Sequence, residues 1–100
     1  MPEDVKDKVL REFYRLQIAR CRRYAAISKI ARTNPVGHSN VSLAEFVKRR
    51  NEETCGEECF RNLQEDFLAM KPALSGLGCS DRALYHIEKE IRKAKEAEGY

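Results

Sequence analysis

The sequence of 100 residues predicts a small all-α protein, an antiparallel bundle of three to four helices. Apolar residues recur at helical spacing through most of the chain, no stretch alternates as a β-strand does, and loop-forming residues are concentrated in short segments. Helices that each carry one apolar stripe remove those stripes from water most fully when the stripes pack against one another. We therefore predict a single helical domain over residues 1–100, with helices at about 3–32, 42–71 and 80–97.

The first helix is predicted from Pro2 and the acidic residues that follow it, both of which suit a first helical turn. Its predicted stripe comprises Val5, Val9, Leu10, Phe13, Leu16, Ile18, Cys21, Tyr24, Ile27 and Ile30. The segment 33–40, TNPVGHSN, combines Pro, Gly, Asn and Ser. The helix must therefore end before Pro35.

The second and third helices are predicted from capping patterns. Ser42 and Glu45 have capping-box spacing, and Ser80 with Asp81 can begin the last helix. In the second helix we expect a kink at Gly56, an end near Pro72, and a stripe of Phe60, Leu63, Phe67 and Met70. The stripe of the last helix is Leu84, Ile87, Ile91 and Ala94.

Charge is distributed unevenly along the chain. The segment from Arg11 to Arg32 contains seven basic residues and one acidic residue, whereas the segment from Val41 to Tyr100 contains ten basic and twelve acidic residues. An acidic partner should therefore meet the first helix. No apolar run approaches the roughly eighteen residues of a membrane span, so we expect no such span.

Four cysteines, Cys21, Cys55, Cys59 and Cys79, are too few for a disulfide scaffold, and we expect mostly buried thiols in a reducing compartment. The alternative pairs Cys55 or Cys59 with Cys21 or Cys79 in an oxidising compartment. Neither His38 nor His86 has metal-ligand spacing around it. We expect no metal site and no catalytic residue.

The segment from Val9 to Tyr24, VLREFYRLQIARCRRY, resembles the opening of the mitochondrial LYR-motif proteins. These are small helical proteins with a Leu-Tyr-Arg tripeptide near the start of helix one, followed by a basic pair and an aromatic residue. Phe13-Tyr14-Arg15 stands at the tripeptide, and Arg22-Arg23-Tyr24 stands at the second element. Phe replaces the usual Leu, and the family's downstream basic helix is represented only loosely by Phe46 and residues 48–50.

The resemblance implies a non-catalytic adaptor or accessory subunit of a mitochondrial respiratory or iron-sulfur assembly complex, on the matrix side and without an evident cleavable presequence. It implies that the basic first helix binds acyl carrier protein, through Phe13, Tyr14, Arg15, Arg20, Arg22, Arg23 and Tyr24. No cofactor would bind directly. The carrier's acylated phosphopantetheine would enter a groove lined by Ile18, Phe60, Leu63 and Phe67 together with Phe13, residues that could equally form a filled core.

Two alternatives stay open from the residues alone. The chain could be a helical structural subunit of a large complex, unrelated to that family. It could also be a small basic nucleic-acid-binding regulator, because arginines between Arg15 and Arg23 can neutralise phosphates. A mild pI of 8.7 and the mixing of these arginines with core-forming residues argue against nucleic acid.

Overall fold

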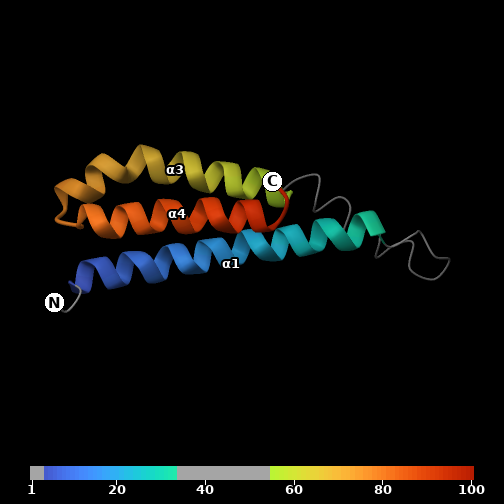
Figure 1. Cartoon of the computed structure of the whole chain (residues 1–100), viewed down its shortest axis with the longest axis horizontal. Coiled ribbons are helices and arrows are strands. Elements are labelled where there is room, and N and C mark those ends of the chain that lie inside the picture. The colour runs from blue at the N-terminus through green and yellow to red at the C-terminus, as the bar shows by residue number, and fades with distance from the viewer. Residues whose placement is uncertain (1–3, 34–54) are drawn as a thin grey trace.

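The computed structural model describes residues 4–33 and 55–100, which form the helices α1 (Val5–Thr33), α3 (Gly56–Gly76) and α4 (Asp81–Ala97). These two ranges contain no strand, and the predicted all-α bundle is confirmed. Helices α1 and α4 run in the same direction, while α3 lies against both and runs the opposite way (Figure 1). No described helix has a stretch apolar enough to cross a lipid bilayer.

The core-facing side of α1 is narrower than its apolar residues predict. Tyr14, Ile18, Cys21 and Ala25, which recur every three or four residues, are buried in the bundle. The predicted stripe is wrong at four positions, whose side chains are exposed by half or more: Val5, Val9, Phe13 and Leu16. The ten predicted positions extend around more than one face of the helix, and α3 and α4 can cover only one of those faces.

Helix α3 differs from the predicted span 42–71 at both ends. Cys55 has an extended backbone and caps the helix, its Sγ accepting a hydrogen bond of 3.2 Å from the Glu58 amide. Helix α3 therefore starts at Gly56, and residues 42–54 of the predicted span lie outside the described residues. At the other end α3 passes through Pro72 to Gly76. A proline inside a helix costs about 3 kcal/mol, and burial of Leu74 one half-turn later helps to offset that cost.

Helices α1 and α3 approach closely where Gly56 meets Ala25. A Cβ atom on Gly56 would lie only 2.6 Å from the Ala25 Cα, so the missing side chain permits this contact. Nearby, Cys21 and Cys59 are joined by a disulfide with their Cα atoms 5.4 Å apart. The expectation of reduced thiols is wrong for this pair, because spacing along the chain does not reveal which cysteines meet in the fold. Cys55 and Cys79 are free and half-buried.

A buried carboxylate fastens the start of α4 to α1. Asp7, 6% exposed, accepts hydrogen bonds from the Ser80 amide at 3.0 Å and from the Ser80 hydroxyl at 2.8 Å. The Ser80 Oγ in turn accepts from the Ala83 amide at 3.1 Å, which confirms the predicted cap. Lys6 adds a hydrogen bond of 3.0 Å from its Nζ to the Leu77 carbonyl.

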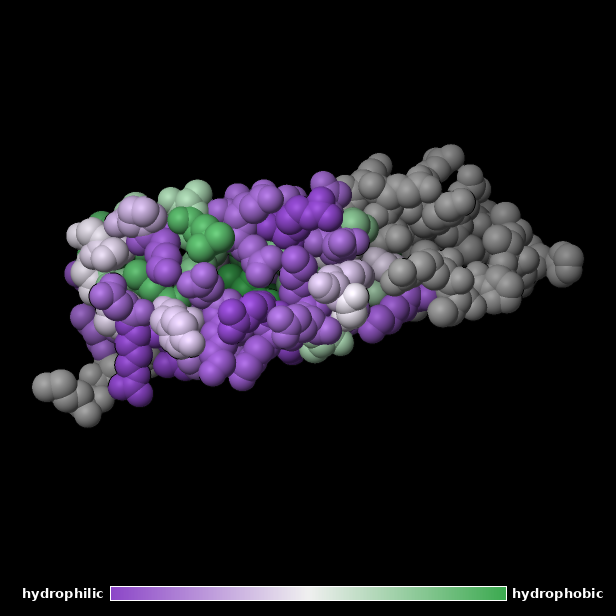
Figure 2. All heavy atoms as spheres, turned by 45° about the horizontal axis from the view of Figure 1, so that its top comes forward, coloured by the Kyte–Doolittle hydropathy of each residue, from purple (hydrophilic) through white to green (hydrophobic). Residues whose placement is uncertain are grey.

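The stripe predicted for α4 is confirmed, since Leu84, Ile87, Ile91 and Ala94 are all buried. They pack with Phe60 and Phe67 of α3, and the Phe67 ring meets the Tyr14 ring edge to face with centroids 5.0 Å apart. Met70 of the predicted α3 stripe is 49% exposed. Figure 2 shows a mainly hydrophilic face, with hydrophobic atoms gathered toward the end that holds the turn between α3 and α4.

Phe67→Ala should lower the free energy of unfolding by about 3 to 5 kcal/mol, because it empties a core site. Leu68→Ala is the matched control, since the Leu68 side chain, next to Phe67 in the sequence, is 51% exposed. This substitution should lower the free energy of unfolding by less than about 1 kcal/mol. Urea unfolding followed by circular dichroism measures both. Equal losses would contradict the packing described for α3.

Reduction of the protein should lower its free energy of unfolding by about 4 kcal/mol, because the Cys21–Cys59 bridge closes a loop of 38 residues. The variant Cys21→Ala/Cys59→Ala is the control and should not respond to reductant. Guanidinium unfolding with and without reductant measures the effect. Alkylation of the unreduced, denatured chain should label only Cys55 and Cys79.

Candidate functional site

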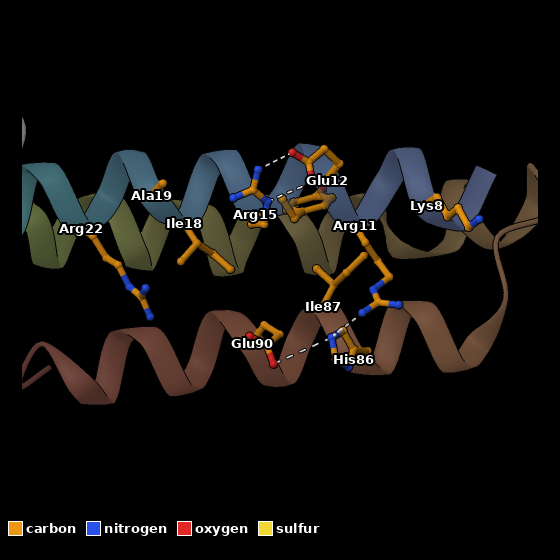
Figure 3. Close-up of a pocket in the computed structure, with 11 residues that line it drawn as sticks. Lys8, Arg11, Glu12, Arg15, Ile18, Ala19, Arg22, His86, Ile87 and Glu90 are labelled. Atoms are coloured by element: carbon orange, nitrogen blue, oxygen red, sulfur yellow. Dashed lines mark hydrogen bonds and ion pairs between the residues drawn. The ribbon is translucent and has the colours of Figure 1, made fainter. Parts of the chain in front are cut away.

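A solvent-open groove of about 600 Å³ runs between α1 and α4. Its lining residues are Lys8, Arg11, Glu12, Tyr14, Arg15, Ile18, Ala19, Arg22, His86, Ile87 and Glu90. Four are basic and two are acidic, which leaves the groove positive. Ile18 and Ile87 are buried residues that form an apolar floor beneath the charged side chains (Figure 3).

Arg11 and His86 connect the two walls of the groove. The guanidinium Nη2 of Arg11 lies 3.1 Å from His86 Nε2, so it can donate to a neutral imidazole. Glu90 lies one turn along α4, with its carboxylate 3.8 Å from the same ring nitrogen. Arg11 is therefore held across the groove by α4, as Figure 3 shows.

Arg15 turns back along α1 to Glu12. Its Nε donates to the Glu12 carboxylate at 2.9 Å, and this hydrogen bond holds the pKa of Glu12 below its ordinary value. The Arg22 side chain does not fold back along α1 and extends from α1 toward α4 (Figure 3). Arg22 is thus the basic side chain best placed to receive an anionic group from outside.

The predicted partner-binding residues divide between different faces of α1. Arg15 and Arg22 line the groove, whereas Phe13, Arg20 and Arg23 do not. Arg20 instead places its guanidinium over the Tyr24 ring, 5.4 Å from the centroid. Tyr14 is 3% exposed and belongs to the core. A partner on the surface can therefore reach only the groove-facing edge of Tyr14.

The five residues predicted to line an acyl groove do not line a common groove, and Phe13 is 51% exposed. Ile18 forms part of the basic groove, but Phe60 and Phe67 are 0% and 1% exposed and fill the core. Leu63 is partly buried and packs against that core. Phe60, Leu63 and Phe67 therefore belong to the filled core, which is the alternative that the sequence left open for them.

Seven residues of the groove were not predicted from the sequence: Lys8, Arg11, Glu12, Ala19, His86, Ile87 and Glu90. Lys8 and Arg11 could have been found, because they share a helical face with Arg15 and Arg22 at spacings of three, four and seven residues. The residues of α4 could not, since their place depends on the parallel alignment of α4 with α1.

The groove is suited to binding anionic groups, since it combines guanidinium donors with an apolar floor. Within the described ranges no three His, Cys, Asp or Glu side chains are grouped so that they could hold a metal ion. No protein-family model, curated protein or solved structure matches this chain.

Tyr14→Phe should make the protein more resistant to alkali. Burial, together with the nearby Asp66 carboxylate, raises the pKa of the Tyr14 hydroxyl above its ordinary value of 10.0. Tyr14 therefore ionises at a lower pH in the unfolded chain than in the folded protein. As a result, the free energy of unfolding should fall as the pH rises above about 10. Urea unfolding between about pH 8 and pH 11 should show a smaller fall for Tyr14→Phe.

The matched control is Tyr85→Phe, which removes a hydroxyl from a side chain that is 63% exposed. This variant should keep the alkaline fall of the wild type. If Tyr14→Phe also keeps it unchanged, the Tyr14 hydroxyl is not buried in the way described.

Proposed function

We propose that this protein is a non-catalytic LYR-like adaptor or accessory subunit of a mitochondrial respiratory or iron-sulfur assembly complex. It binds acyl carrier protein through the basic groove between α1 and α4 and a larger complex through other surfaces. The observation that carries the proposal is the row of Lys8, Arg11, Arg15 and Arg22 along one side of an apolar floor. The family resemblance between Val9 and Tyr24 supplies the identity of the partner.

Charge and shape support this assignment. An acidic carrier surface would complement the groove, and electrostatic attraction of this kind raises association rates and selects partners. Most basic side chains of the groove are exposed to solvent. Pairing them with a partner's carboxylates at the rim therefore costs little desolvation free energy. The groove lies open along its length, as a helix or loop of a partner protein requires.

The carrier's phosphopantetheine arm also finds suitable chemistry in the groove. Arginine binds phosphate oxygens in bidentate fashion, and Arg22 with Arg15 stands at the rim. An acyl chain would lie over Ile18 and Ile87 on the floor. Entry of the chain into the bundle interior would require Phe60 and Phe67 to move, because both are fully buried.

The disulfide favours a second candidate function. Disulfides persist in oxidising compartments, and the Cys21–Cys59 bridge therefore suits a compartment such as the intermembrane space better than the matrix. A helical structural subunit of a large complex, unrelated to acyl carrier protein, would fit that setting. The redox state of the two cysteines in protein taken from its source separates these two candidates.

Arg15→Glu/Arg22→Glu should weaken binding of acylated carrier protein by about tenfold or more for each arginine, because both substitutions place carboxylates in the groove. The matched control is Arg20→Glu/Arg23→Glu, with the same change of charge outside the groove; its affinity should stay within about threefold of the wild type. Isothermal titration calorimetry measures affinity, and circular dichroism confirms folding.

Three results would contradict the proposed function. The wild type could fail to bind the carrier, or both double variants could lose binding equally, which would mean that the groove is not the site. Saturable binding to duplex or single-stranded nucleic acid with a steep salt dependence would favour the nucleic-acid-binding alternative.

A further inference from the structure

Helix α1 carries a second apolar row that faces away from the bundle. Val5, Val9, Phe13 and Leu16 are 72%, 64%, 51% and 54% exposed. They follow one another at intervals of three or four residues, so they share one side of the helix. None of them lines the groove between α1 and α4. Isolated apolar residues on a surface are ordinary, but a continuous row of this length marks an interaction surface.

The row continues along α1 with the spacing of a coiled coil. From Val9 the residues on this side are Val9, Phe13, Leu16, Arg20, Arg23 and Ile27, separated by alternating steps of four and three. That alternation gives the 3.5-residue repeat by which two helices keep contact along a seam. We name these six residues the α1 seam. Its first half is apolar, and the exposed Arg20 and Arg23 occupy the next two core positions.

We propose that the α1 seam binds an acidic amphipathic helix of a partner protein. Apolar residues of that helix would face Val9, Phe13 and Leu16, and its carboxylates would face Arg20 and Arg23. Polar residues at core positions of a coiled coil fix the register and the choice of partner at a cost in stability. Two adjacent arginines at such positions therefore select a partner that presents acidic side chains there.

The charge of α1 argues against a second copy of this chain as the occupant. A parallel copy would place Arg20 and Arg23 against the same arginines. An antiparallel copy centred on Phe13 and Leu16 would place Arg20 beside Val9, where no carboxylate can meet it. Glu12 borders this side of the helix, but it is already paired with Arg15.

The position of the arginines also argues against a membrane surface. A helix that lies in the membrane interface keeps its cationic residues on its polar face, away from the acyl chains. Arg20 and Arg23 stand in line with Phe13 and Leu16, so insertion of the row would press both guanidinium groups toward the apolar layer. A helix with an apolar half and an acidic half satisfies both parts of the seam.

The seam and the groove use different sides of α1. Arg22 lines the groove and Arg23 belongs to the seam, although they are adjacent in the sequence. One helix can therefore hold two partners at once. The inference about the seam does not depend on acyl carrier protein, because none of the seam residues lines the groove.

The test uses designed helical peptides of about three heptads. One peptide carries leucine at the core positions that face the apolar half and glutamate at the two that face Arg20 and Arg23. A second peptide has lysine in place of those glutamates, and each is made in both chain orders. Fluorescence anisotropy with the folded full chain should show that the glutamate peptide binds at least about tenfold more tightly than the lysine peptide.

Variants then assign the binding to the seam. Arg20→Glu/Arg23→Glu should reverse the preference, so that the lysine peptide binds more tightly. Phe13→Ser/Leu16→Ser should abolish binding of both peptides while circular dichroism shows an intact fold, since both side chains are exposed. The matched control is Arg22→Glu, which should leave the preference for the glutamate peptide unchanged.

Several outcomes would overturn the proposal. Failure of both peptides to bind in either chain order would contradict it, and so would equal binding of the two peptides. Analytical ultracentrifugation could show a dimer that Phe13→Ser/Leu16→Ser abolishes, which would assign the seam to a second copy. Binding to vesicles of phosphatidylcholine and phosphatidylserine that the same variant abolishes would assign it to a lipid surface.

Discussion

The contact between the backbones of α1 and α3 at Ala25 and Gly56 sets the spacing on which the other contacts depend. A side chain on Gly56 would collide with the Ala25 backbone, so the two helices can meet here only because that side chain is absent. The same approach brings Cys21 within bonding distance of Cys59. Farther along, Tyr14 and Phe67 pack across the same interface. Small residues at one end and aromatic rings at the other let two helices of different length share one core.

The groove follows from how α4 is held against this pair. At its start, α4 is fastened to α1 through Asp7 and Ser80. Its apolar stripe packs into the core that α1 and α3 form together. Because α4 runs parallel to α1, the basic side of α1 lies beside one side of α4, and the groove forms between them. Helix α1 thus contributes a buried side, a charged side and an apolar exposed side, and each side has a different environment.

The fold could be predicted from the sequence more completely than the site. Ser80 and the stripe of Leu84, Ile87, Ile91 and Ala94 announce α4 because capping and periodicity are local properties. The ten apolar positions of α1 did not reveal which of its sides faces the core, because that choice depends on how many helices cover it. The sequence leaves open whether Phe67 lines a groove or fills the core, and only the packing of α3 against α1 and α4 decides between them. His86 lines the groove because of the register of α4 relative to α1, and no local sequence pattern predicts that register.

Asp7 has a role that reaches beyond its hydrogen bonds, because α1 and α4 start at the same end of the bundle (Figure 1). The aligned peptide dipoles of each helix concentrate partial positive charge at that end, and two parallel helices bring two such charges together. Asp7 lies in the first turn of α1 and accepts the Ser80 amide at the cap of α4. A single buried carboxylate therefore lies close to the positive ends of both helix macrodipoles, and Asp4 and Asp81 add acidic charge at the same two helix starts.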